Sequence, residues 1–125
     1  MTATIFKVCS DEAWAEALTT GAFTGSPDDD RDGFIHLSTA EQLHGTLEKH
    51  FRDIDDLVLI AFATAPLGDA LKWEPSRNNE LFPHYYGALP VSAALSVAPL
   101  PLNEDGIPDA PSVADLNAMA GGGDD

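Results

Sequence analysis

Cysteine is nearly absent from this chain of 125 residues, which contains one, Cys9. A single cysteine excludes an internal disulfide, so the fold must depend on a hydrophobic core. Hydrophobic residues make up 44% of the sequence, close to the average for globular proteins, and the length is typical of one domain. We therefore expect one globular domain rather than a disulfide-stabilised or disordered chain.

Basic residues are also scarce. Lysine and arginine total 6 against 21 aspartates and glutamates, which gives a formal net charge of −15. Proteins that bind nucleic acid carry a basic patch, and helices that lie on anionic membranes carry a basic face. We therefore expect neither nucleic acid nor membrane as a partner, and a small molecule or nucleotide as ligand only where a local basic pocket exists.

Long apolar runs and well-known motifs are missing. No apolar run approaches the roughly 20 residues of a membrane span, and residues 1–7 do not resemble a signal peptide. These features predict a cytoplasmic protein of bacterial type. The nucleotide-binding patterns Gly-x-Gly-x-x-Gly and Gly-Lys-Ser/Thr are absent, which excludes the Rossmann and P-loop classes. Neither His-x-x-Glu-His nor Cys-x-x-Cys occurs, so no metal site is expected.

Periodicity predicts strands interspersed with two main helices. One helix is expected to begin at Ser10 and end at Gly21, and the other to follow the capping box of Ser38 and Glu41. The continuous apolar run over 57–62 is typical of a strand buried on both faces. Further strands are expected over 4–8, 34–37, 71–74 and 95–100. This order predicts an α+β fold with small mixed or antiparallel sheets.

Three segments lack a regular pattern. Residues 28–33 read as a polar loop, and residues 78–87 as a loop rich in polar and aromatic side chains. Residues 103–125 are acidic and aperiodic. We therefore expect one domain over residues 1–102 and an acidic, flexible C-terminal tail over residues 103–125.

The aspartate-rich loop allows a calcium hypothesis. Asp28, Asp30, Asp32 and Gly33 match the opening of an EF-hand loop, but its twelfth position, which needs a bidentate glutamate, is Thr39. A solvated loop is therefore favoured. A calcium-dependent interaction domain is kept as a second alternative function.

Residues 33–39 form the first candidate ligand site. His36 lies on a predicted strand, and the hydroxyls of Ser38 and Thr39 follow at a helix start. Backbone N–H groups at a helix start attract anions or carbonyl oxygens, so the imidazole beside them could bind an amide or a ribose hydroxyl. The alternative is a structural histidine with hydroxyls that only cap the helix.

Residues 72–87 form the second candidate site. Glu74, Arg77 and His84 combine a carboxylate, a guanidinium and an imidazole, and aromatic rings lie among them. Such rings could stack on a planar ligand, and Arg77 could bind phosphate in a fork geometry. The alternative is that Phe82 and one tyrosine only pack beneath the loop.

These segments resemble a known family. Gly33–Thr39, Trp73–Glu74 and Phe82–Gly87 are similar to the bacterial family called Domain of Unknown Function 952 (DUF952), over residues 5–102. That family is similar in fold to the ADP-ribosyltransferases. The resemblance implies an ADP-ribosylation-like fold, in which two small sheets surround a cleft that holds the nicotinamide end of NAD. It also implies that His36 and Ser38 meet the ribose and amide, and that Tyr85 or Tyr86 stacks on nicotinamide.

One part of the pattern is missing. No Glu-x-Glu or Gln-x-Glu occurs late in the chain, which leaves Glu74, Glu80 or His84 as substitutes for the late glutamate. We expect an NAD-utilising ADP-ribosyl transferase or glycohydrolase, and alternatively a non-catalytic module that binds a nucleotide or small molecule. The expected catalytic residues are His36, Glu74 and His84. The expected cofactor-binding residues are Ser38, Thr39, Trp73, Arg77, Tyr85 and Tyr86.

Overall fold

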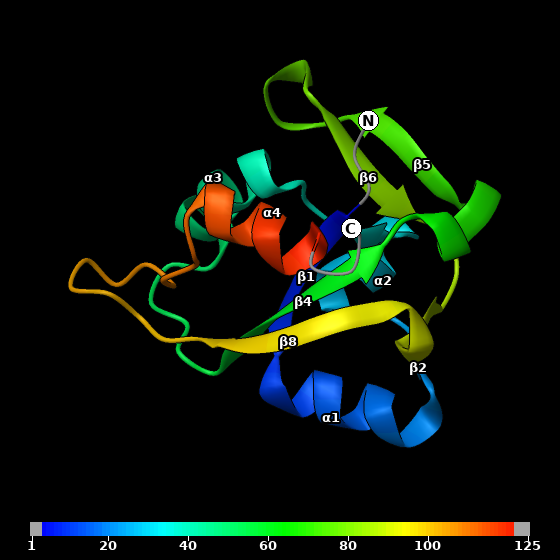
Figure 1. Ribbon diagram of the computed structural model, residues 1–125, viewed down its shortest axis with the longest axis horizontal. Coiled ribbons are helices and arrows are strands. Elements are labelled where there is room, and N and C mark those ends of the chain that lie inside the picture. The colour runs from blue at the N-terminus through cyan, green and yellow to red at the C-terminus, as the bar shows by residue number, and fades with distance from the viewer. Residues whose placement is uncertain (1–3, 122–125) are drawn as a thin grey trace.

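The computed structural model describes residues 4–121, which form small antiparallel sheets and flanking helices (Figure 1). The largest sheet has the strand order β1 (Thr4–Ser10), β4 (Leu57–Ala63) and β8 (Ala94–Leu100). Both strand pairs are antiparallel. The predicted α+β class with small antiparallel sheets is confirmed.

The central strand β4 is buried on both faces, as its apolar run predicts. Ile60 and Phe62 face one core cluster, whereas Leu59 and Ala61 face another. This division follows from the alternation of side chains along a strand. Helix α1 (Asp11–Thr20) covers one face of the sheet, and helices α3 (Ala40–His50) and α4 (Val113–Gly121) cover the other (Figure 1).

Helix α1 (Asp11–Thr20) begins and ends where its caps predict. The Ser10 hydroxyl accepts a hydrogen bond from the backbone N–H of Ala13, and Gly21 ends the helix with a φ of 95°. The short sheet of β2 (Ala22–Phe23) and β7 (Leu89–Pro90) follows beside it.

The third sheet has the order β3 (Ile35–His36), β6 (Leu81–Tyr85) and β5 (Leu71–Pro75). It is joined to β1 by an isolated bridge, in which the backbones of Phe6 and Ser38 exchange two hydrogen bonds. Strand β6 lies within the segment expected to be a loop, so that expectation is wrong. Short 3-10 turns complete the connections: η1 (Ala65–Ala70), η2 (Arg77–Asn79) and η3 (Val91–Ala93).

The aspartate-rich segment is also helical rather than a loop. Helix α2 (Pro27–Asp32) begins with proline after Ser26, and the Asp29 carboxylate accepts the backbone N–H of Ser26. A proline at the first position and a carboxylate that caps the start both favour a helix. Helix α3 (Ala40–His50) is capped by Thr39 with Gln42, one residue later than the predicted Ser38 and Glu41.

Of the expected tail over residues 103–125, the structure describes residues 103–121, and residues 122–125 lie outside the described residues. Helix α4 (Val113–Gly121) packs beside α3, and Leu116 is 0% exposed in the core cluster that also holds Leu43, Leu47 and Leu100. Helix α4 therefore contributes to the core of the same domain. Among the described residues, no helix has the length and apolar character needed to cross a membrane.

Candidate functional site

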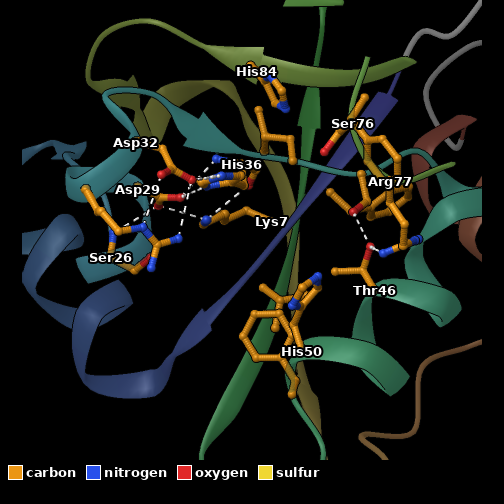
Figure 2. A pocket seen from close by; sticks show the side chains of 17 residues that line it. Lys7, Ser26, Asp29, Asp32, His36, Thr46, His50, Ser76, Arg77 and His84 are labelled. Atoms are coloured by element: carbon orange, nitrogen blue, oxygen red, sulfur yellow. Dashed lines mark hydrogen bonds and ion pairs between the residues drawn. The ribbon is translucent and has the colours of Figure 1, made fainter. Parts of the chain in front are cut away.

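A pocket of about 300 Å³ lies between β1, the third sheet and helices α2 and α3 (Figure 2). Three of the six lysines and arginines line it, and so do three of the four histidines. Its charged and polar lining residues are Lys7, Ser26, Asp29, Arg31, Asp32, His36, Ser38, Thr46, His50, Ser76, Arg77 and His84. The basic groups of this acidic chain are thus concentrated at one site.

The pleat of the third sheet decides which side chains can reach this pocket. His36 on β3 pairs directly with His84 on β6, which in turn pairs with Lys72 on β5. Residues two apart along a strand share a face, so Glu74 lies on the same face as these three. The opposite face carries Tyr85, which packs against the first core cluster. The two histidines therefore lie side by side on one surface.

His36 is held between two carboxylates. Its Nδ1 lies 2.6 Å from Asp29 Oδ1, and its Nε2 lies 2.9 Å from Asp32 Oδ2. An ionised carboxylate only accepts hydrogen bonds, so both ring nitrogens must donate when both aspartates are charged. The His36 ring is therefore held at both of its nitrogens. Arg31 also bonds to Asp32, at 3.1 Å from Nε to Oδ1.

Asp29 and Lys7 form a buried ion pair beneath His36. Lys7 Nζ donates to Asp29 Oδ2 over 2.9 Å and to the backbone carbonyl of His36 over 3.0 Å. Burial opposes ionisation of Asp29, but hydrogen bonds from His36 and the Lys7 ammonium outweigh it and hold the pKa of this carboxyl below its usual range. The pair ties β1, α2 and β3 together at one end of the pocket.

His84 is positioned by a carboxylate and by an aromatic ring. Its Nδ1 lies 2.7 Å from Glu74 Oε1, and the Tyr86 hydroxyl donates to the same oxygen over 2.8 Å. These hydrogen bonds, from His84 first and Tyr86 second, lower the pKa of Glu74, and the bond to Glu74 raises the pKa of Tyr86. The Phe34 ring stacks on His84 with centroids 4.0 Å apart. The orientation of the His84 ring is therefore fixed.

Arg77 forms the other side of the pocket, where Figure 2 shows it beside Thr46. Its Nη1 donates to Thr46 Oγ1 over 3.3 Å, and its guanidinium lies over the Phe82 ring at 5.0 Å. Gly45 leaves room for it, because a Cβ at that position would lie 3.0 Å from Arg77 Nη2. Within residues 4–121, no carboxylate lies within salt-bridge distance of Arg77.

The expected site residues fall into two groups. His36, Ser38, Arg77 and His84 line the pocket, and Ser38 also bonds to Thr46 over 3.2 Å. The others do not line it. Glu74 bonds to His84 and to Tyr86, Thr39 caps helix α3, Tyr85 packs against the core, and Trp73 lies on the opposite face of its strand.

Several lining residues were not expected from the sequence. Lys7, Asp29 and Asp32 belong to segments interpreted as a strand and a solvated loop, and Thr46 and His50 lie on α3. The sequence offered one usable signal, since Ser26 and Pro27 followed by Asp29 form a helix-start pattern that places Asp29 at a fixed position. Among the described residues, no cluster of three or more histidine, cysteine or acidic side chains could hold a metal ion.

Comparison with known proteins places the chain in a family. Residues 8–97 match the family described as protein of unknown function (DUF952), and the chain belongs to it. The family expected from the histidine motifs is thereby confirmed. No curated protein matches the chain.

The chain is similar to solved structures of the protein CC0527 from Caulobacter crescentus. The crystal structure is 44% identical with a TM-score of 0.85, and the match covers 92% of this chain and 98% of that one. The solution NMR structure is 46% identical with a TM-score of 0.77, covering 85% and 91% of the two chains. The fold described above is therefore shared with that protein along nearly the whole chain.

Proposed function

We propose that this pocket binds a phosphorylated nucleotide of the NAD type. The observation that carries the proposal is Arg77, a fixed guanidinium at the pocket wall with no carboxylate partner among residues 4–121. In a chain with a net charge of −15, such a cation would readily be neutralised by one of the many acidic side chains. An arginine held apart from them is suited to an anionic ligand, and its planar fork matches phosphate oxygens.

The surroundings of Arg77 fit a phosphate ester. The hydroxyls of Ser38, Thr46 and Ser76 line the same pocket and supply further hydrogen-bond donors. A volume of about 300 Å³ is at the lower end of the range for ligand pockets. The pocket is therefore suited to one nucleotide half of NAD, and the other half would extend over its rim.

The activity proposed for this site is that of an NAD-utilising ADP-ribosyl transferase or glycohydrolase. His84, which is held by Glu74, and Asp32 provide the polar groups that would face a ribose held by Arg77. A cationic, oxocarbenium-like ribosyl group is stabilised by carboxylates, and Asp32 is a partly exposed carboxylate on the pocket wall.

One observation favours the second candidate, a binding module without chemistry. Both ring nitrogens of His36 are engaged by Asp29 and Asp32, so the ring has no nitrogen left for a ribose hydroxyl. In that case Arg77 and the hydroxyls would hold the nucleotide while the histidines served as structural groups.

A thermal-shift screen tests binding. NAD, ADP-ribose, nicotinamide and inorganic pyrophosphate are each added to the wild type, to Arg77→Ala and to Arg77→Lys. A ligand at 100 times its dissociation constant stabilises the fold by about 2.7 kcal/mol, which is easily measured for a domain of this size. We expect NAD and ADP-ribose to stabilise the wild type, Arg77→Ala to remove the shift, and Arg77→Lys to restore it in part.

The matched control is Arg52→Ala, since Arg52 does not line the pocket and bonds to the backbone carbonyl of Asp105. An equal loss in Arg52→Ala and Arg77→Ala would mean that only net charge matters, and would refute the proposal. Release of nicotinamide from NAD separates the two candidates, because a binding module shows the thermal shift without the release.

A further inference from the structure

We infer that His84 is a general base that activates water for attack on the bound nucleotide, with Glu74 and Tyr86 as positioning residues. This inference rests on the proposed function, because the base needs the nucleotide beside it. The sequence pattern suggested only that His84 could replace a carboxylate in stabilising charge. The geometry of its ring points to proton transfer instead.

The first argument is the position of the ring hydrogen. Glu74 Oε1 lies 2.7 Å from His84 Nδ1 and also accepts the Tyr86 hydroxyl over 2.8 Å. A carboxylate that accepts two hydrogen bonds is held in its ionised form, so Nδ1 must carry the hydrogen. In the neutral ring the lone pair then lies on Nε2, which is the tautomer that a general base requires.

The second argument is where Nε2 lies. The His84 side chain is 6% exposed, and it lines the pocket. Within the part of the chain that the structure describes, Glu74 is the one side chain that hydrogen-bonds to the ring, through Nδ1, so Nε2 has no protein partner. Nε2 is also not fully buried, since a fully buried atom without a partner would be unsatisfied and Nε2 is not such an atom. Nε2 is therefore neither bonded to protein nor sealed in the core, which leaves it open to the pocket.

The third argument is rigidity. Phe34 stacks on the ring with planes 24° apart, and the His36 ring lies edge-on at 5.7 Å between centroids. In Figure 2, Arg77 lies to the right of both His36 and His84. The titratable groups that surround His84 are Glu74 and Lys72 on β5, Tyr86 after β6, and His36 on β3. A ring fixed in this way does not have to be ordered when substrate binds.

The step proposed for this base is hydrolysis of the bond between nicotinamide and ribose. The water oxygen forms a bond to the anomeric carbon of the ribose while Nε2 takes one water proton. The carbon–nitrogen bond breaks, and its electron pair leaves with nicotinamide, which becomes neutral. The products are ADP-ribose, nicotinamide and the proton, which His84 releases to solvent.

The test compares His84→Gln, Glu74→Gln and Tyr86→Phe with His44→Gln, a control on the exposed side of α3. For each variant, NAD binding is measured by thermal shift and nicotinamide release by turnover. We expect His84→Gln to retain the thermal shift and to lose about 10²–10⁴-fold in rate. Glu74→Gln should lose less and Tyr86→Phe least, while His44→Gln should match the wild type.

Nitrogen-15 NMR of the His84 ring supplies a readout that does not need activity. We expect the neutral His84 ring to carry its hydrogen on Nδ1 rather than on Nε2, with this preference weakened in Glu74→Gln. Hydrogen on Nε2 in the wild type would overturn the inference whether or not NAD binds. Full turnover in His84→Gln, or no turnover in a wild type that NAD stabilises, would overturn it and leave nucleotide binding intact. A wild type that NAD does not stabilise would refute the proposed function itself, and the base with it.

Discussion

Replacing Asp29 with asparagine should destabilise the fold more than replacing any other aspartate with asparagine or any glutamate with glutamine. The Asp29 side chain is 2% exposed, and its carboxylate accepts hydrogen bonds from Lys7 Nζ, from His36 Nδ1, and from the backbone N–H groups of Ser26 and His36. Asparagine would place an amide NH₂ where some of these donors point. It would also leave the Lys7 ammonium, 5% exposed, without its counter-ion.

The magnitude follows from that burial. Removing one partner of a buried ion pair costs about 3–5 kcal/mol, because the other charge stays desolvated. The stability of a whole domain is about 5–15 kcal/mol, so Asp29→Asn should lose a large share of it. Asp30→Asn is the matched control, since Asp30 is an exposed neighbour on the same helix, and its change should stay within about 0.5 kcal/mol.

The loss should also depend on pH. Folding lowers the pKa of Asp29 below its ordinary value of 3.8. A carboxyl of this kind contributes stability that is fully present above its unfolded pKa and is lost as pH falls toward its folded pKa. The difference between wild type and Asp29→Asn should therefore be constant near neutral pH and shrink as pH falls below about 4.

Urea unfolding followed by tryptophan fluorescence measures both effects, since Trp14 lies in the core and packs edge-on against Phe62. A loss under about 1 kcal/mol at pH 7 would contradict the cost expected for a buried pair. A difference that stayed constant down to pH 2 would show that the charge of Asp29 is not what stabilises the fold.

Three further predictions test the core, the thiol and the arginine site. Leu116 is fully buried, so Leu116→Ala should lower the free energy of unfolding by about 2–5 kcal/mol. For the same reason, truncation after Leu102 should weaken cooperative melting, and an unchanged melt would mean that α4 is dispensable. Cys9 should resist thiol reagents at pH 8 until urea unfolds the chain, because burial raises the pKa of its thiol to about 11; rapid labelling of the native protein would disprove this. Gly45→Ala should stabilise helix α3 by up to about 1 kcal/mol, because alanine favours a helix more than glycine does. It should also reduce the thermal shift with NAD, because the added Cβ would displace Arg77. A retained shift would show that the guanidinium is not held in place.

The sequence predicted the parts of the fold that depend on local patterns. The apolar run of β4 and the caps at Ser10 and Gly21 each carry their signal within a few residues. Strand β6 was missed because Pro83 lies in the middle of it and cannot donate to a neighbouring strand. Its carbonyl instead accepts the backbone N–H of Leu37.

The site was predicted in part for a similar reason. His36 and His84 stood out because each lies among polar or aromatic neighbours, and the structure places both at one pocket. Asp29 and Lys7 are 22 residues apart, and nothing local marks either of them as a buried partner of the other. The sequence also did not predict that His84 and Tyr85 lie on opposite faces of a sheet, because the segment that forms β6 was interpreted as a loop.

The gathering of cations at one pocket of an acidic chain affects how fast ligands arrive. A net charge of −15 repels anions at long range, and the Debye length is about 8 Å at physiological ionic strength. Added salt screens this repulsion more than it weakens contacts inside the pocket, so a small phosphorylated ligand should associate faster as salt rises. The same repulsion grows with the charge of the incoming molecule, so the chain should admit a mononucleotide to the proposed site at Arg77 more readily than a long polyanion.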